Sequence, residues 1–478
     1  MRVLLLKTLP ATAGPDIGLG YLATALRSAG HEVEVGDLEF DDARGKPRTV
    51  ARRVRDLAPD WVGVKVFDHT VGRGRSYLAE ARAAKPDIHT AAGGPHPSGF
   101  RARTLESLPE ADFAIAGEAE RAFPELIAAV RDGGDLGAIP GLVRRTPEGV
   151  VVGHQDFPED LDALGLPAWD LLHPREHVEL QMREPWLDRP IPYVPIITTR
   201  GCPFPCTFCA APVTTGKKLR HHSVAFVVDE IEHLRDVYGI ETFSIADDAF
   251  TNDRRYVDAF CEEIIRRRIR VRWDASSNGI RADTVDEKLA RLLDAAGCEK
   301  VAFGIESGSE RIVQAMGKRF APDDVERALG ILRRESKIRT EGFFIIGYPD
   351  ERLSDAWQTL KLLSRIDLDT AWLFGFSPHV GTKVSEMLHG HATESIPWGD
   401  FANDRVMLGT RHLPRWVVRV YWVLAWMTFY LRPSRAVRFI QHLGPTAVPR
   451  ALMRLANRVR LVLVPATRPL PPPAPAAA

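Results

Sequence analysis

Two series of short apolar runs, each run followed by a stretch with helical spacing, occupy most of the chain. The first series comprises RVLLLK, HEVEVGD, DWVGVKVFD, IHTAAGG and ADFAIAGE, at residues 2–7, 31–37, 60–68, 88–94 and 111–118. Between them, segments such as residues 17–30 place apolar side chains at helical intervals. Strands that alternate with helices of this length predict an α/β domain with a parallel, flavodoxin-like sheet.

The second series begins near residue 193 and has six apolar runs. They are YVPIITT, IETFSIAD, VRWDASS, KVAFGIES, EGFFIIG and AWLFGFS, at residues 193–199, 240–247, 271–277, 300–307, 341–347 and 371–377. Helical segments lie between the runs. Six successive βα units predict a partial (β/α)6 barrel of the TIM type, whose active face is the carboxyl end of its strands.

Changes in composition divide the chain further. Residues 136–190 are rich in Pro and Gly, and residues 401–464 are rich in Arg and Trp with helical patterning. We therefore predict five parts: an N-terminal domain, a linker, the barrel, a helical C-terminal region and a disordered Pro/Ala tail. Their bounds are residues 1–135, 136–190, 191–400, 401–464 and 465–478.

Net charge, cysteine content and hydropathy lead to three further expectations. The 478 residues have a formal net charge of +0 and are 45% hydrophobic, which is ordinary for a globular protein and gives no sign of nucleic-acid binding. Five cysteines without disulfide-like spacing favour a reducing compartment, here the cytoplasm. The apolar run Val420–Leu431 is shorter than the roughly 18–20 residues that span a bilayer, so no transmembrane segment is expected.

Three of the cysteines fall in the stretch RGCPFPCTFC, residues 200–209. Cys202, Cys206 and Cys209 have the spacing C-x3-C-x2-C, directly after the first predicted barrel strand. Three thiolates on one loop can hold three irons of a cubane cluster and leave the fourth iron open. A zinc site usually has paired C-x2-C units, and Cys261 and Cys298 are too isolated to supply a second pair. The spacing favours a [4Fe-4S] cluster over zinc or three structural cysteines.

With Phe208 as the aromatic of C-x3-C-x-aromatic-C, the loop resembles the signature of the radical S-adenosylmethionine (SAM) superfamily. The resemblance implies that SAM binds the open iron and is cleaved to a 5′-deoxyadenosyl radical. It also implies SAM contacts from the ends of successive barrel strands. The candidates are Phe208, Asp247, Asp248, Ser276, Ser277, Asn278, Arg281 and Glu306. Asp247 and Asp248 have an alternative role at a helix N-terminus.

The N-terminal domain carries a second resemblance. GGPHPSG at residues 93–99 and GEAE at residues 117–120 resemble the cobalamin-binding domain of class B radical SAM enzymes. The resemblance implies cobalamin contacts from Gly93, Gly94, His96, Pro97, Ser98, Gly117 and Glu118. The cobalt-ligating pattern D-x-H-x-x-G is absent, because DHTVG at residues 68–72 has a different spacing, so we predict no histidine–cobalt bond. His96 could instead cap a turn.

The resemblance implies an enzyme that binds a [4Fe-4S] cluster, SAM and cobalamin. We expect it to methylate an unactivated carbon of a small-molecule biosynthetic intermediate, through the 5′-deoxyadenosyl radical and methylcobalamin. A low-potential donor such as flavodoxin or ferredoxin would supply electrons. The alternatives are a cobalamin-dependent cyclase, rearrangement or oxidative enzyme, and a non-catalytic cobalamin carrier or sensor.

The sequence does not assign a role to two further segments. In FSPHVGT, residues 376–382, Val380 departs from the Pro-Gly-Thr that the family usually has. Residues 415–431 mix aromatic side chains with arginine. They suit either a peripheral helix on a membrane surface or a helix whose aromatic face packs on the barrel, and we favour the barrel contact.

Overall fold

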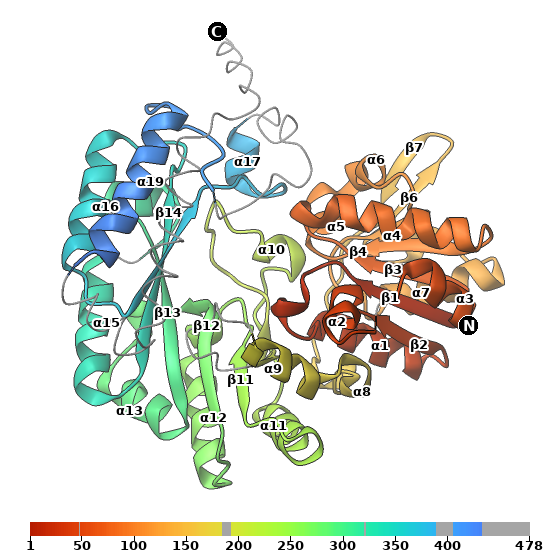
Figure 1. The fold of residues 1–478 in the computed structure, drawn as a ribbon, viewed down its shortest axis with the longest axis horizontal. Coiled ribbons are helices and arrows are strands. Elements are labelled where there is room, and N and C mark those ends of the chain that lie inside the picture. The colour runs from red at the N-terminus through yellow and green to blue at the C-terminus, as the bar shows by residue number, and fades with distance from the viewer. Residues whose placement is uncertain (47, 184–192, 320–321, 389–404, 433–478) are drawn as a thin grey trace.

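A computed structural model describes residues 1–46, 48–183, 193–319, 322–388 and 405–432. Figure 1 shows two lobes side by side. The N-terminal lobe is drawn in red and orange, and the second lobe runs from green to blue. Each lobe is built around its own sheet. No described helix is long and apolar enough to cross a membrane.

The N-terminal lobe has a seven-stranded sheet in the order β2-β1-β3-β4-β5-β6-β7. The strands are β1 Arg2–Lys7, β2 Glu32–Gly36, β3 Trp61–Lys65, β4 His89–Gly93, β5 Phe113–Ile115, β6 Leu142–Thr146 and β7 Gly149–Val152. The first five are parallel, which confirms the flavodoxin-like order. The hairpin β6–β7 extends this sheet antiparallel to β5, so part of the segment predicted as a linker belongs to the lobe.

Helices cover both faces of this sheet. They are α1 Ile17–Ser28, α2 Leu38–Ala43, α3 Val50–Leu57, α4 Val71–Ala84, α5 Pro95–Phe100, α6 Thr104–Ser107 and α7 Ala122–Asp132. Residues 3–6 of β1 form an unbroken buried apolar run, as expected of a parallel strand covered on both sides. Asp16 caps α1 and Thr49 caps α3 by accepting hydrogen bonds from backbone N–H groups. Two short helices, α8 Trp169–Leu172 and α9 Pro174–Arg183, lead toward the second lobe.

The second lobe is an open barrel of six parallel strands in chain order, β8-β11-β12-β13-β14-β15. The strands are β8 Val194–Ile196, β11 Thr242–Ile245, β12 Arg272–Ile280, β13 Cys298–Glu306, β14 Arg339–Ile346 and β15 Thr370–Gly375. The helices are α10 Ala211–Thr214, α11 Val224–Tyr238, α12 Arg254–Arg266, α13 Glu287–Ala295, α14 Glu310–Ala315, α15 Pro322–Glu335, α16 Leu353–Arg365 and α17 Lys383–Met387. The six predicted strands and the partial barrel are confirmed.

Two very short strands frame the cysteine-rich stretch. The strand β9, Thr199–Arg200, pairs antiparallel with β10, Arg220–His221. The stretch with the three cysteines and α10 lies between them in the chain, immediately after the first barrel strand. The cysteines are therefore placed at the carboxyl end of the barrel, where such folds carry their sites.

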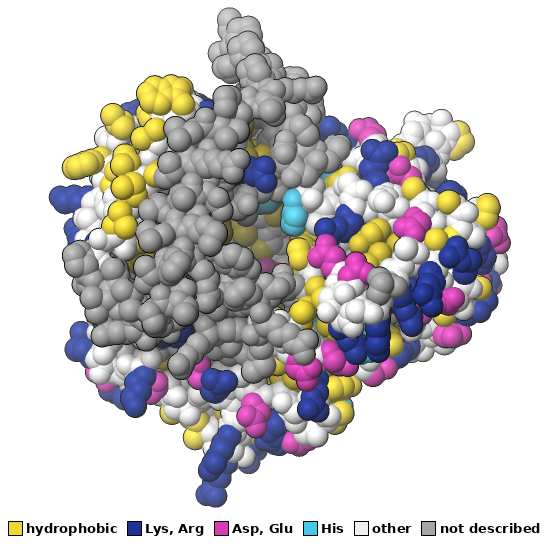
Figure 2. All heavy atoms as spheres, viewed as in Figure 1, with side chains coloured by type: hydrophobic (Ala, Val, Ile, Leu, Met, Phe, Trp, Pro, Cys, Tyr) yellow, Lys and Arg dark blue, Asp and Glu magenta, His cyan; other side chains and the backbone are white. Residues whose placement is uncertain are grey.

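The last described helix, α19 Arg415–Tyr430, packs on the outside of the barrel. Its buried side chains, which include Tyr421, Trp422 and Phe429, face β14, β15 and α16. Its opposite face is also apolar and is exposed, with Trp416 at 68% (Figure 2). The favoured contact with the barrel is thus present, although it uses only one face of the helix. The predicted tail, residues 465–478, lies outside the described residues.

Candidate functional site

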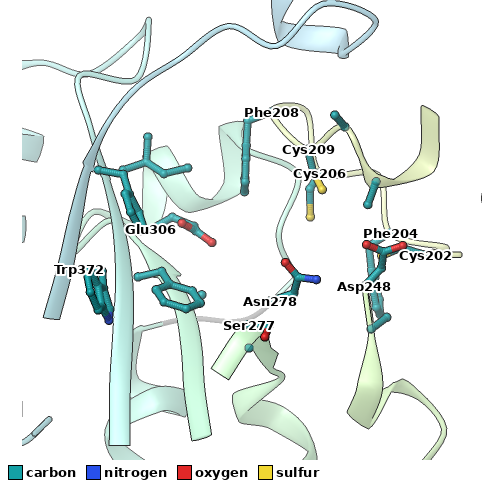
Figure 3. Close-up of a pocket in the computed structure, with 18 of the residues that line it drawn as sticks. Cys202, Phe204, Cys206, Phe208, Cys209, Asp248, Ser277, Asn278, Glu306 and Trp372 are labelled. Atoms are coloured by element: carbon teal, nitrogen blue, oxygen red, sulfur yellow. The ribbon is translucent and has the colours of Figure 1, made fainter. Parts of the chain in front are cut away.

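A cavity of about 1360 Å³ lies at the carboxyl end of the barrel strands, and residues of both lobes line it. The second lobe contributes the cysteine loop and the ends of β11 to β15, shown in Figure 3. The N-terminal lobe contributes Phe67, Asp68, His69 and Pro95. This volume exceeds the roughly 300–1000 Å³ of a typical small-molecule pocket, so the cavity has room for more than one ligand.

The cysteine loop forms one wall. Cys202, Cys206 and Cys209 are free thiols, and Figure 3 shows the sulfur atoms of Cys206 and Cys209 directed into the cavity. The backbone N–H of Thr207 donates to the carbonyl of Met316 at 2.9 Å, and the Thr207 hydroxyl lies 2.9 Å from the hydroxyl oxygen of Tyr348. These contacts with two later segments of the barrel fix the loop.

The donor set of this loop fits an iron–sulfur cluster. Burial raises the pKa of all three thiols, that of Cys209 to about 12, so a bound cation is needed to hold them as thiolates at neutral pH. Each thiolate of a cubane binds a different iron. The sulfurs therefore need not converge, and the described ranges contain no group of three His, Cys, Asp or Glu side chains around a single ion.

Glu306 and Lys318 form the opposite part of the wall. The Nζ of Lys318 lies 2.5 Å from Oε1 of Glu306 and 2.7 Å from the carbonyl of Gly304. Glu306 has a φ of +64°, a strained conformation for a residue other than glycine and one that clusters at functional sites. A Cβ on Gly304 would lie 2.6 Å from both charged groups, so any other residue at this position would require the ends of these two side chains to shift.

Lys318 is absent from the sequence-based candidates. A signal for it existed, because Lys318 ends the stretch FGIESGSERIVQAMGK that also contains Glu306. The other candidates that line the cavity are Phe208, Asp248, Ser276, Ser277, Asn278 and Arg281. The Arg281 guanidinium stacks over the ring of Phe204 at 4.1 Å, and Asp248 accepts a hydrogen bond from Thr215 at 2.6 Å. Together with Glu306, seven candidates from four separate chain segments are thus brought to one cavity.

Asp247 is placed differently. Its side chain is buried behind the wall, where it accepts hydrogen bonds from the backbone N–H of Thr198 at 2.7 Å and the hydroxyl of Thr199 at 2.9 Å. Burial raises its pKa to about 6. Its carboxylate therefore joins the end of β11 to the segment that enters the cysteine loop, and a direct SAM contact from Asp247 stays a prediction.

His96 is also buried away from the cavity. Its Nδ1 lies 2.8 Å from Asp68 and its Nε2 lies 2.8 Å from the hydroxyl of Ser107. Asp68 additionally lies 3.5 Å from Nδ1 of His379 in the second lobe. Burial alone would raise the pKa of Asp68. Hydrogen bonds from His379 and His96 outweigh this effect and hold the pKa below its usual range. The histidines that reach the cavity wall are His69 and His379.

The glycine-rich segment around α5 also joins the lobes. The Ser98 hydroxyl donates to the carbonyl of Gly94 at 2.9 Å and accepts from the N–H of Gly117 at 2.9 Å, which ties the two predicted cobalamin motifs together. A Cβ on Gly99 would lie 2.5 Å from the carbonyl of Val380. The loop that departs from the family pattern at Val380 therefore packs directly on the end of α5. Of this segment, Pro95 lines the cavity, whereas none of the seven predicted cobalamin-binding residues does.

Glu118 takes part in a buried ion-pair network between the lobes. Its carboxylate accepts from Arg220 at 2.6 Å and lies 3.3 Å from Arg200. Arg200 also donates to Glu120 at 2.8 Å, and these carboxylates raise its pKa although burial opposes this. The predicted cobalamin contact Glu118 is thus engaged by arginines that the sequence did not single out. Cobalamin binding by its carboxylate stays a prediction.

Two family models match the chain, one on each lobe. The B12 binding domain matches residues 5–127, and the radical SAM superfamily matches residues 196–363. The chain belongs to the cobalamin-dependent (class B) radical SAM family. The cofactors of this family are a [4Fe-4S] cluster, SAM and cobalamin, and the cysteine loop and the wall from the N-terminal lobe fit them.

Curated members of this family align over most of the chain. An uncharacterized methyltransferase of Pyrococcus horikoshii is 29% identical over 454 residues, which is 92% of this chain and 93% of the relative. The cytidylyl-2-hydroxyethylphosphonate methyltransferase of Streptomyces wedmorensis is 28% identical, over 77% of this chain and 76% of its own. An anaerobic magnesium-protoporphyrin IX monomethyl ester cyclase of Rubrivivax gelatinosus is 29% identical over 73% of this chain and 61% of the relative.

Solved structures of family members share the fold. The radical SAM methyltransferase TsrM of Kitasatospora setae, with cobalamin and a [4Fe-4S] cluster bound, gives a TM-score of 0.66 at 24% identity over 82% of this chain and 75% of that one. The cobalamin-dependent radical SAM enzyme OxsB gives a TM-score of 0.73 at 16% identity over 97% of this chain and 72% of that one. The arrangement of two lobes is therefore that of the family.

Proposed function

We propose that the protein is a cobalamin-dependent radical SAM methyltransferase acting on an unactivated carbon of a small-molecule biosynthetic intermediate. The observation that carries this proposal is one cavity walled by the cysteine loop on one side and by the B12-binding lobe on another. When bound, the cluster and SAM supply a carbon-centred radical, and cobalamin supplies the methyl group. The protein holds these groups in position, provides charged side chains that contact them, and excludes water from the cavity.

Each part of the wall has a separate task in this proposal. Cys202, Cys206 and Cys209 hold the cluster. The Glu306–Lys318 pair and the polar side chains Asp248, Asn278 and Arg281 hold the polar groups of SAM, since they line the cavity near the loop. The remaining wall is largely aromatic and excludes water from the reacting carbon, with Phe343, Trp372, Phe374 and Phe376.

The wall from the N-terminal lobe is the proposed face for cobalamin. It lies at the carboxyl ends of β3 and β4, where ligands of parallel α/β sheets bind. Phe67, His69 and Pro95 would face the corrin, and Gly93, Gly94, His96, Pro97, Ser98 and Gly117 would shape the loops that hold its nucleotide tail. This assignment would set cobalamin in the same cavity as the cysteine loop, as methyl transfer requires.

The cell must also reduce the cluster. We propose a low-potential flavodoxin or ferredoxin as the electron donor, and the cytoplasm as the compartment, because the described cysteines include no disulfide and the cluster needs reducing conditions. A cyclase would use the same cofactors. We favour methyl transfer because the methyltransferase of Pyrococcus horikoshii is 29% identical over 92% of this chain, whereas a cyclase of Synechocystis that covers the same share is 24% identical.

Methyl-labelled SAM tests the proposal without a known substrate. The reconstituted, cobalamin-loaded protein would be incubated anaerobically with a low-potential reductant. We expect S-adenosylhomocysteine, with the label recovered in the cobalamin fraction, and neither product when cobalamin is omitted. Accumulation of 5′-deoxyadenosine with unlabelled cobalamin would favour the cyclase or rearrangement alternative. No SAM turnover at all would favour a carrier or sensor.

A further inference from the structure

Exposed apolar side chains gather on two neighbouring helices, α16 and α19. Of the thirteen large hydrophobic side chains exposed in the described residues, seven lie on this pair. They are Leu353 and Trp357 on α16, and Trp416, Val420, Leu424, Met427 and Leu431 on α19 or directly after it. Figure 2 shows hydrophobic side chains grouped over these helices, and we refer to the seven residues as the apolar face.

The spacing makes this face continuous. Leu353 and Trp357 are four residues apart, and Trp416, Val420 and Leu424 follow one another at the same interval, so each set lies along one side of its helix. Trp357 is 67% exposed and Trp416 is 68% exposed. Burying such large apolar side chains is favourable, and a contiguous exposed face marks an interaction site rather than ordinary surface.

The charged residues on and beside these two helices indicate which kind of partner fits the apolar face. Neither helix exposes an acidic side chain: α19 has none, and Asp355, the one carboxylate of α16, is 2% exposed and bound to Arg311. Arg352 and Lys361 are exposed beside the apolar residues of α16. From Arg405 to residue 478 the sequence contains twelve arginines and neither Asp nor Glu, in a chain whose net charge is +0. Five of these arginines lie in the described residues 405–432, which include α19 and contain no carboxylate, so positive charge accompanies the apolar face there.

We infer that the apolar face docks on the surface of an anionic phospholipid bilayer. Large aromatic and aliphatic side chains that enter the headgroup region, on helices that expose basic and no acidic side chains, are the features of interfacial membrane binding. The described helices are too short to span the membrane, so the contact is peripheral. This inference concerns the outer surface of the barrel and is independent of the chemistry in the cavity.

Vesicle co-sedimentation of the full-length, reconstituted protein tests this inference. The probes are vesicles of phosphatidylcholine alone and vesicles that also contain phosphatidylglycerol. We expect binding to the anionic vesicles that weakens as salt is raised. The double variant W416E/L424E should lower the partition coefficient at least about tenfold, because both substitutions put charge into the buried contact. The matched control V237E/I265E changes two exposed apolar residues on α11 and α12 and should bind as the wild type does.

Three outcomes would overturn the inference. The first two are a wild type that sediments with neither kind of vesicle and a W416E/L424E variant that binds as tightly as the wild type. A dimer of the wild type in size-exclusion chromatography that W416E/L424E converts to a monomer, without vesicle binding, would assign the face to a second copy of the chain. Iron content and SAM cleavage, which should be unchanged in W416E/L424E, report that the variant is folded.

Discussion

Arg200, the last residue before the cysteine loop begins at Gly201, donates a hydrogen bond at 2.8 Å to Glu120 of the N-terminal lobe. Both side chains are almost fully buried, at 6% and 8% exposure. The segment that holds the cluster is thereby tied to the lobe that matches the B12 binding domain. The relative position of the two cofactor walls depends on this network.

Replacing Arg200 with Met should therefore destabilise the protein strongly. The substitution leaves Glu118 and Glu120 buried without their shared partner, and removing one member of a buried pair costs about 3–5 kcal/mol of unfolding free energy. Urea denaturation measures the loss. The control is Arg27→Met, which breaks the exposed pair with Asp170 and should cost less than about 1 kcal/mol. Equal losses in the two variants would mean that the network does not hold the lobes.

Replacing any one of Cys202, Cys206 and Cys209 with Ala should abolish cluster binding. The remaining two thiols are too few to hold three irons, so iron and sulfide per chain, the cluster absorbance and SAM cleavage should all be lost. The control Cys298→Ala removes a buried thiol at the start of β13 and should keep the cluster. A Cys206→Ala protein that retained a full cluster would contradict the assignment of the ligands.

Replacing Gly304 with Ala should weaken SAM binding while leaving the cluster in place. The added methyl group would lie 2.6 Å from Nζ of Lys318 and Oε1 of Glu306, so both charged ends would have to leave their present positions on the cavity wall. We expect the Kd for SAM, measured by equilibrium dialysis, to rise about tenfold or more, which corresponds to roughly 1.4 kcal/mol. Gly330→Ala in the middle of α15 is the control, because the added methyl group would lie 3.4 Å from Arg334, an ordinary contact distance. An unchanged Kd for SAM in Gly304→Ala would show that the Glu306–Lys318 pair does not contribute to SAM binding.

The buried carboxyl of Glu230 should make the free energy of unfolding depend on pH. Its side chain is fully buried against Trp169, and burial raises its pKa to about 8, above the ordinary value of 4.5. A carboxyl with a raised folded-state pKa stabilises the protein below its unfolded pKa, and this contribution is lost as the pH rises through 8. Glu230→Gln keeps the acceptor for Trp169 but cannot ionise. The wild type should therefore lose about 3–5 kcal/mol relative to this variant between about pH 5 and pH 9.

Thermal and urea unfolding of both proteins across that pH range check this prediction. Asp229→Asn, a change at a 65% exposed residue on the same helix, serves as the control and should show no comparable trend. A constant difference between the wild type and Glu230→Gln at every pH would show that Glu230 does not change its ionisation within this range.

The parts of the fold that the sequence predicted are those with local signals. Buried parallel strands are unbroken apolar runs, and the cluster ligands share one loop, so spacing alone reveals both. The Glu118–Arg220 pair joins residues that are 102 positions apart in the sequence, and no local sequence pattern predicts such a contact. Likewise, the role of Lys318 depends on a bare backbone at Gly304, and the hairpin β6–β7 was hidden in a Gly-rich segment. The ion pair, the position of Lys318 and the hairpin all depend on tertiary packing, which the local sequence does not reveal.

The central claim is that one cavity brings the cluster and cobalamin together. Electron paramagnetic resonance of the anaerobic protein with a reduced cluster and cob(II)alamin tests it most directly, because both centres are paramagnetic. We expect each signal to be broadened by the other, and the cob(II)alamin signal to sharpen in Cys206→Ala, which lacks the cluster. Spectra that equal the simple sum of the two isolated centres would contradict the account.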